Sequence, residues 1–191
     1  MARTPSFDRD TVVRAARSLF WQTGYEVASI PDIEAATGLN RSSIYNAFGS
    51  KRGLFDAAVQ SYLDEVIRPR LRPLQHEQVE EDALLGYLDG LRDAFSRASG
   101  LPGCLLVNTA STPLAENSEI SQIITDYRAE LRVAFGRGVS AYLPDATVAE
   151  VERLADTVTD LVIAAFALVR VAPDVAIHTL ATAHATITSE Q

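Results

Sequence analysis

Residues 29–51, SIPDIEAATGLNRSSIYNAFGSK, contain the start and stop signals of two short helices that follow each other closely. Ser29, with Asp32 three residues later, has the pattern of a capping box, in which each side chain accepts a backbone N–H of the helix start. Pro31 suits the first turn of that helix because its missing N–H would have no helical partner there. Gly38 is the residue type that most often ends a helix. This part of the chain is therefore predicted to form one short, well-delimited helix.

A second short helix is predicted directly after Gly38. Asn40 is a favoured N-cap residue, and Ile44 and Phe48 are spaced to share one inward face. Gly49 breaks this helix. Two helices joined by so short a turn predict a helix-turn-helix, whose second helix lies in the major groove of DNA with its N-terminal residues facing base edges. Here those residues are Asn40, Arg41, Ser42 and Ser43.

Helical spacing continues on both sides of this motif. One helix is expected from about Asp8 to the residue before Gly24, and another from the cap Ser50 to about Ile67, where prolines indicate a hinge or a helix end. Further helices are expected at about 80–98, 103–113, 117–141, 147–170 and 174–188. We find no sustained apolar–polar alternation typical of strands. The sequence predicts an all-α fold of about nine helices, with residues 1–55 as the helix-turn-helix domain and 56–191 as a helical domain, linked by the helix that begins at residue 50.

The composition excludes several classes of protein. With 47% apolar and 22% charged residues, the 191-residue chain has an ordinary globular composition. Its one cysteine, Cys104, rules out an internal disulfide. No leader peptide is recognisable, and the longest apolar run, Leu161–Val169, is far shorter than the ~20 residues of a membrane span. We therefore expect a cytoplasmic protein.

The net charge of −8 is unevenly distributed along the chain. Residues 1–55 hold seven Lys or Arg against five Asp or Glu, whereas residues 56–191 hold ten against twenty. This distribution fits an N-terminal domain (the head) that contacts phosphate groups and a second domain that does not.

Residues 12–55 resemble the DNA-binding domain of the TetR family of repressors. The matching positions are Ala15-Ala16, Leu19-Phe20, Gly24-Tyr25-Glu26, Ser29–Ile33, Ala36–Leu39, Ser43-Ile44-Tyr45, Phe48–Lys51 and Leu54. The spacing of Tyr45, Phe48 and Ser50-Lys51 is much more specific than a generic helix-turn-helix. One departure is Ala47, where many relatives carry histidine.

The resemblance implies a role for individual residues of the head. Tyr45 is expected to contact a phosphate through its hydroxyl, and Lys51 to contact another at the start of the next helix, where free N–H groups also favour an anion. Ser29 is expected to cap its helix and touch phosphate. Base reading is assigned to Arg41, Ser42 and Asn46, and Arg3 is expected to reach the backbone or the minor groove. Each of these side chains could instead be an ordinary packing or surface residue.

The resemblance also implies a small-molecule effector bound in the helical domain. Aromatic and aliphatic walls with a few polar groups are typical of such pockets. The candidate residues are Tyr87, Leu91, Phe95, Cys104, Leu105, Asn108, Tyr127, Leu131 and Phe166, each of which could equally be plain core. Cys104 opens a predicted helix, and its segment is similar to one in a TetR subgroup with electrophile-responsive members. An electrophile-sensing repressor is therefore an alternative, against the simpler interpretation of a small packing residue.

The last two helices are expected to form a four-helix bundle with a second copy of the chain, a role also implied by the resemblance. The candidate interface residues are Val158, Leu161, Val162, Ala165, Val169, Ile177, Leu180, Ala181 and His184, and the alternative is an intrachain core. A homodimer would suit a two-fold symmetric site on double-stranded DNA.

Other functions have weaker support. No metal-ligand spacing surrounds the three histidines, and no phosphate loop or nucleophile elbow occurs, so we expect neither an enzyme nor a cofactor. A helical adaptor that binds only protein would have no use for Tyr45 and Lys51 beside a capped polar helix. The resemblance to the TetR family implies a repressor that its effector releases from operator DNA by shifting the helix that begins at residue 50.

Overall fold

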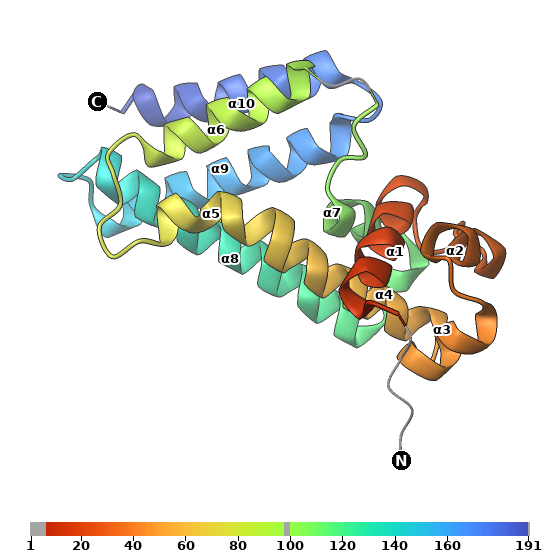
Figure 1. The fold of residues 1–191 in the computed structure, drawn as a ribbon. Coiled ribbons are helices and arrows are strands. Elements are labelled where there is room, and N and C mark those ends of the chain that lie inside the picture. Colours follow the sequence, from red (N-terminus) through yellow and green to blue (C-terminus); the bar gives the residue numbers. More distant parts are fainter. Residues whose placement is uncertain (1–6, 98–99, 191) are drawn as a thin grey trace. The chain divides into compact units, whose positions relative to one another are not determined.

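The computed structural model describes residues 7–97 and 100–190, and all regular structure in that part is helical (Figure 1), which confirms the all-α class. The chain divides into two compact units, one ending at Arg68 and the other beginning at Pro69. Within the described ranges, no helix has the length and apolar character needed to cross a bilayer.

The first unit contains α1 (Arg9–Thr23), α2 (Ile30–Thr37), α3 (Arg41–Phe48) and α4 (Lys51–Tyr62). Each helix starts at a predicted cap: the side chains of Asp8, Ser29, Asn40 and Ser50 accept backbone N–H groups of the first turns. The core of the unit consists of side chains with no exposed surface from all four helices, among them Phe20, Ile33, Ile44, Leu54 and Phe55.

Helical structure does not end near Ile67, where the sequence predicted a hinge or helix end. A π-helical turn, η1 (Leu63–Ile67), follows α4 directly, and α5 (Arg68–Gln75) follows η1. The N–H of Arg68 bonds to the carbonyl of Leu63, five residues back, and this wider turn lies immediately before Pro69. A proline ring clashes with the carbonyl four residues before it in a regular helix, and a wider turn is one way to relieve that clash. Pro73 lies inside α5.

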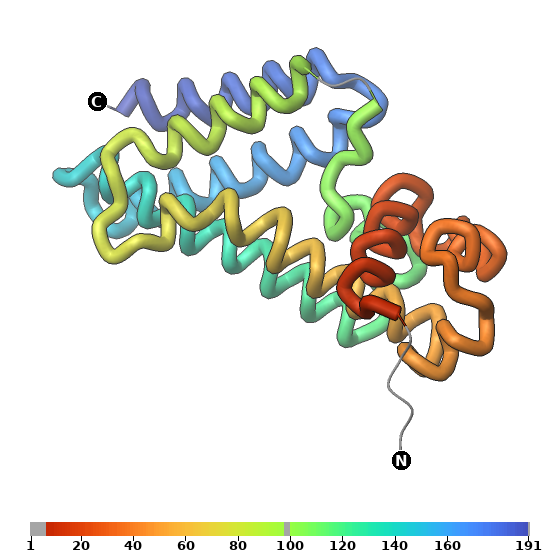
Figure 2. Tube along the Cα trace, in the orientation of Figure 1, coloured from red at the N-terminus to blue at the C-terminus, as the bar shows by residue number. Residues whose placement is uncertain are grey.

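The second unit contains α6 (Ala83–Arg97), α7 (Leu105–Ala110), the 3₁₀ turn η2 (Pro113–Glu116), α8 (Ser118–Tyr142), α9 (Val148–Leu168) and α10 (Pro173–Thr188). In this unit α9 packs against both α8 and α10, and α10 also packs on α6, as the chain trace shows (Figure 2). The helix predicted at 103–113 is shorter than expected because it stops before Pro113, which starts η2.

Gly138 of α8 is the point where α8 approaches both α5 and α6. A methyl group added there would lie 2.6 Å from Cβ of Leu84 and 2.8 Å from Cδ2 of Leu74, closer than real side chains come. Leu74 and Leu84 have no exposed surface. The glycine therefore sets how closely α8 packs against the helices before and after the α5–α6 loop.

We predict that Gly138→Ala lowers the melting temperature of the second unit, since overpacking a core of this kind costs about 1–3 kcal/mol. Gly136→Ala is the matched control on the same helix, because its added methyl would lie 3.5 Å from Cβ of Ala155, an ordinary contact. Circular dichroism melting curves of the two variants would test this. Equal melting temperatures would contradict the proposed tight packing at Gly138.

Candidate nucleic-acid interface

The turn between α2 and α3 is closed by a glycine in the left-handed backbone conformation and by one hydrogen bond from the start of α3 to a side chain of α2. Gly38 adopts φ +70°, and its N–H bonds to the carbonyl of Glu34. The carboxylate of Glu34 in turn accepts the backbone N–H of Arg41, the first residue of α3. Because one residue of α2 serves both contacts, the start of α3 is tied directly to the helix before it.

The outward face of α3 is polar, and its inward face is anchored by Ile44, which has no exposed surface. Arg41, Ser42, Tyr45 and Asn46 are exposed, and Ser43 is half-buried. The Arg41 guanidinium lies 5.5 Å from the centroid of the Tyr45 ring. Asn40 is also exposed, but its side-chain oxygen accepts the N–H of Ser43 at 2.9 Å. Its amide N–H groups are the part that remains for DNA.

The far end of α3 is held by Arg9, a residue that the sequence analysis missed. Its guanidinium donates a hydrogen bond to the carbonyl of Ala47 at 3.1 Å and lies 4.4 Å from the centroid of the Phe48 ring. A cation at a helix C-terminus also interacts favourably with the helix dipole. The contact joins residues 38 positions apart in the chain, so no local sequence pattern could have predicted it.

Gly53 allows α4 to start close to the end of α3. A methyl group added at Gly53 would lie 2.1 Å from the carbonyl oxygen of Phe48. Between the two helices, Gly49 adopts φ +77°, a conformation that glycine takes without steric cost. The last turn of α3 and the first turn of α4 are therefore in backbone contact.

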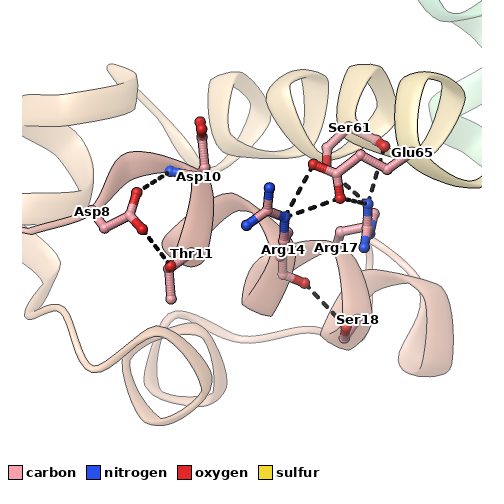
Figure 3. Close-up of polar contacts among 8 residues, drawn as sticks. All are labelled: Asp8, Asp10, Thr11, Arg14, Arg17, Ser18, Ser61 and Glu65. Atoms are coloured by element: carbon pink, nitrogen blue, oxygen red, sulfur yellow. Dashed lines mark hydrogen bonds and ion pairs between the residues drawn. The ribbon is translucent and has the colours of Figure 1, made fainter.

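Two arginines of α1 converge on one carboxylate beyond the end of α4 (Figure 3). Nε of Arg14 donates to both carboxylate oxygens of Glu65 at 3.0 Å, and Nη1 of Arg17 donates to Glu65 at 2.8 Å. Arg17 also donates to the carbonyl and hydroxyl oxygens of Ser61, at 3.0 and 2.9 Å. These hydrogen bonds lower the pKa of Glu65, those from Arg14 contributing most. The contacts fix α1 along α4 and η1.

Lys51, the only lysine of the chain, lies at the first position of α4. Its Nζ lies 4.5 Å from the centroid of the Tyr25 ring, and that ring packs edge-on against Phe55 at 5.1 Å. Partial burial lowers the pKa of Lys51. The aromatic contact holds the ammonium group beside the start of α4, where unpaired N–H groups attract anions.

Of the other two residues predicted to contact DNA outside α3, Ser29 is engaged in a helix cap and Arg3 lies outside the described residues. The Ser29 hydroxyl donates to the carboxylate of Asp32 at 2.5 Å and accepts the backbone N–H of Asp32, so its main visible role is the capping box. Arg3 lies outside the residues that the structure describes.

Comparisons with known proteins agree on one family. The family model "Bacterial regulatory proteins, tetR family" matches residues 12–58. The chain is 30% identical over 143 residues to the uncharacterized HTH-type transcriptional regulator YezE of Bacillus subtilis, a match that covers 73% of this chain and 72% of YezE. It is 31% identical over 123 residues to the HTH-type transcriptional repressor ComR of Escherichia coli, covering 64% of this chain and 59% of ComR.

The chain belongs to the TetR family of transcriptional regulators. Among solved structures, it superposes on the TetR-family regulator CifR, a cysteine mutant in complex with 26-bp operator DNA, with a TM-score of 0.77 at 27% identity, covering 95% of this chain and 98% of that one. A TetR regulator from Chloroflexus aurantiacus gives a TM-score of 0.73 at 28% identity, covering 95% and 92%.

A cavity of about 490 Å³ lies between α5 and α6 of this TetR regulator. Tyr87 and Leu91, two of the residues predicted to bind an effector, line it. The other candidates are not among the residues that line this cavity. Phe95 and Phe166 pack edge-on at 5.6 Å, and Leu105 and Leu131 are buried. Nδ2 of Asn108 donates to the carbonyl of Pro102 at 2.6 Å, which fixes the turn before α7.

Cys104 has no exposed surface, and its Sγ lies 3.6 Å from the hydroxyl oxygen of Tyr127, itself nearly buried. Next to it, Gly103 adopts φ +75°, which glycine allows. An electrophile would need access to the thiol, so the burial favours the packing role over the sensing role.

Several residues predicted for the dimer interface are buried within their own unit. Val158, Val162, Ala165, Val169 and Leu180 are at most 3% exposed, so they belong to the monomer core in this structure. The remaining four, Leu161, Ile177, Ala181 and His184, are half-buried. Nε2 of His184 lies 3.9 Å from a carboxylate oxygen of Asp89, which places this histidine beside α6.

We predict that Glu65→Gln destabilises the first unit at neutral pH, and that this effect shrinks as the pH falls from 4.5 through the lowered pKa of Glu65. The native pKa of Glu65 is lowered from an ordinary value of 4.5, so the contact stabilises the fold above that value and is lost as the pH falls through the lowered pKa. Glu26→Gln is the control, since Glu26 is exposed and its carboxylate accepts no hydrogen bond from the described residues.

The readout is the fluorescence of Trp21, the only tryptophan of the chain, which packs on Tyr62 at 4.9 Å and thus reports on α1 and α4. Thermal unfolding is followed at neutral and at acid pH. A difference between wild type and Glu65→Gln that persists unchanged into strong acid would contradict the assignment.

Proposed function

We propose that this TetR-family regulator represses transcription as a homodimer that binds a two-fold symmetric operator and leaves it when a small molecule binds the second unit. The observation that carries the proposal is the exposed polar face of α3, fixed at both ends by contacts from α1, α2 and α4. A helix held this firmly with polar side chains pointing outward suits insertion into the major groove. The relatives named as repressors, such as ComR, support repression over activation.

The exposed side chains of α3 divide into base contacts and phosphate contacts. Arg41 carries a planar donor pair that fits guanine O6 and N7, and we assign Ser42 and Asn46 to neighbouring bases. Tyr45 and Lys51 are assigned to phosphates on either side of the groove. Asn40, Ser43 and Ser29 take part in helix caps, and we propose that they contribute to DNA contact mainly through the backbone N–H groups that they orient.

The dimer contact is proposed for the outward faces of α9 and α10. On α9, Leu161, Ala164 and Leu168 follow one another at steps of three or four residues and keep partly exposed side chains, and Val171 in the turn after α9 is exposed. After Asp174 in its first turn, α10 has no Asp, Glu, Lys or Arg, and its outward positions are Val175, His178, Ala181, Thr182 and Ala185. An exposed surface with so few charged groups is typical of an interface, and small residues let helices approach closely.

Release from DNA is proposed to act through the helical run that begins at Lys51. No residue of 51–75 leaves helical structure, because α4, η1 and α5 follow one another directly. Its first residue is a proposed phosphate contact, and Pro69, Arg70 and Pro73 near its end line the α5–α6 cavity. A ligand that repacks α5 can therefore bias the position of the same helical run. Such π-helical turns inside helices frequently occur at functional sites.

The comparisons support a regulator rather than an enzyme, and binding to chromosomal DNA implies a cytoplasmic location. In the described part of the chain, no group of three or more potential metal ligands is present.

We predict that Lys51→Met weakens binding to operator DNA and reduces the salt dependence of the affinity by about one released counterion. The neighbouring Arg52→Met is the matched control, since the Arg52 side chain is paired with Asp56 at 2.7 Å. Fluorescence anisotropy with DNA from upstream of the chain's own gene, at several salt concentrations, gives both quantities. Equal salt slopes for wild type and Lys51→Met would contradict the phosphate contact, and binding no tighter than to random DNA would contradict the proposed operator.

We predict that Leu168→Glu converts a dimer into a monomer, because a buried charge without a partner is strongly unfavourable at an interface. Ala149→Glu is the control at an exposed position near the start of α9 and should leave the dimer intact. Sedimentation velocity measures both masses. A wild-type protein that sediments as a monomer at micromolar concentration would overturn the proposed dimer.

A further inference from the structure

Two glycines in the middle of α6 have no packing role among residues 7–97 and 100–190. Gly86 and Gly90 are one helical turn apart, both are exposed, and a methyl group added at either would meet nothing within 4 Å. Gly53 and Gly138 differ in this respect, since a methyl group there would collide with neighbouring atoms. Each glycine inside a helix costs up to ~1 kcal/mol relative to alanine. The two glycines of α6 therefore carry a cost that contacts with the described residues do not explain.

Both of these glycines line the cavity between α5 and α6. Without side chains, they expose one strip of the α6 backbone to the cavity, where a flat molecule or chain can approach closely. The apolar walls beside this strip include Pro73 of α5 and Leu91 and Ala94 of α6. A volume of about 490 Å³ lies within the usual range for small-molecule sites. The glycine strip thus suggests that the cavity is shaped for an apolar body.

Arg70 and Tyr87, which both carry hydrogen-bond donors, are among the residues that line this cavity. Arg70 has no ion-pair partner among residues 7–97 and 100–190, although the chain is rich in acids. The ring of Tyr87 is fixed against Phe135 at 5.2 Å, and its hydroxyl makes no hydrogen bond to any residue in the described part. Burial raises the pKa of Tyr87 and the charge of Arg70 opposes that rise, so the phenol stays a neutral donor close to a cation.

Asp82 is the one acid that lines the cavity, and it lies at the start of the wall formed by α6. The charge of Arg70 acts on the Tyr87 phenol, and the carboxylate of Asp82 is not among the groups that do. Arg70 therefore supplies a cation at the end of the cavity beside Tyr87, and an anionic group is the complementary ligand there.

We propose that the α5–α6 cavity binds a small monocarboxylate with an apolar aliphatic or aromatic body, whose carboxylate is held by Arg70 and Tyr87 while its body lies on the strip of Gly86 and Gly90. A guanidinium matches a carboxylate with two parallel hydrogen bonds, and one cation suits one negative charge. That this monocarboxylate is the effector rests on the proposed function, whereas its binding to the cavity does not.

The binding test uses the full chain without DNA, so that it is independent of the operator. Isothermal titration calorimetry with octanoate, benzoate and phenylacetate is compared with titration by their uncharged amides, octanamide, benzamide and phenylacetamide. We expect at least one acid to bind, and its amide to bind about tenfold or more weakly, because a charged hydrogen-bond pair is lost. Amide binding as tight as acid binding overturns carboxylate recognition. Absence of binding by all three acids at millimolar concentration overturns the site.

Three variants and one matched control locate the binding. Arg70→Met and Tyr87→Phe remove one donor each, and Gly90→Leu fills the glycine strip where a side chain meets no protein atom. Each is expected to weaken acid binding. Arg70→Met and Tyr87→Phe are expected to keep the wild-type melting temperature, and Gly90→Leu is expected to raise the melting temperature slightly. Arg72→Met, an exposed arginine of α5 that does not line the cavity, is expected to bind as wild type does. Equal losses for Arg70→Met and Arg72→Met overturn the site.

The effector role is read separately, from operator anisotropy with and without the acid that binds. Loss of DNA binding in wild type but not in Arg70→Met supports the role. An acid that binds the cavity and leaves DNA affinity unchanged contradicts the effector role alone, and leaves the site itself supported.

Discussion

The backbone contact between Phe48 and Gly53 is the constraint on which the proposed DNA surface depends. The carbonyl that ends α3 lies where a side chain at Gly53 would have to be, so only glycine lets α4 start so close. The orientation of α3 is then coupled to that of α4, and Arg9 secures the same end of α3 from α1. Since protein interiors resist small deformations, any shift of the first turn of α4 has to be shared by α3.

The helix that begins at this contact is also the one that carries the proposed response. Arg14 and Arg17 of α1 bind Glu65 in the π-helical turn, so α1 is held against η1 as well as against α4. The wider turn lies just before Pro69, where the regular hydrogen-bond pattern would have to change in any case. Such a turn can alter its winding at lower cost than a regular helix, because its hydrogen bonds have alternatives one residue away. The π-helical turn is therefore the place where the helical run can change its winding when α5 moves.

Sequence predicted the features that are local and failed where distant residues meet. The caps at Asp8, Ser29, Asn40 and Ser50 depend on side chains within three residues of the N–H groups they bind, so the starts of the first helices were predicted correctly. Prolines near residue 70 indicated a break, but the π-helical turn let the helix continue. Arg9 could not be assigned, because its partner is 38 residues away.

The difference between local patterns and distant contacts also explains which candidate site residues were assigned incorrectly. Helical spacing identified the apolar stripe of α9 but not which side of it faces the chain's own core, so Val158 and Val162 were assigned to a partner although they are buried in the monomer. Aromatic residues such as Phe95 and Tyr127 are typical of pocket walls, yet both are core residues here. Phe95 packs on Phe166, and the hydroxyl of Tyr127 contacts Cys104. The cavity instead depends on residues that sequence analysis passes over, namely glycines without a packing partner.

Electrostatics gives the strongest reason to look for a specific cation in that cavity. Residues 56–191 carry twice as many acids as bases, so their mean field repels an anion. At physiological ionic strength, that field is screened beyond about 8 Å, whereas a guanidinium in hydrogen-bonding contact with a carboxylate lies well within that distance. An unpaired local cation is therefore a favourable place for an acidic domain to bind an anion. Most arginines of the second unit have a nearby acid, such as Arg128 and Arg132 with Asp156, and Arg70 is placed differently, beside a neutral phenol and an exposed helix backbone. The position of this one charge is what makes a carboxylate the ligand that the cavity suits.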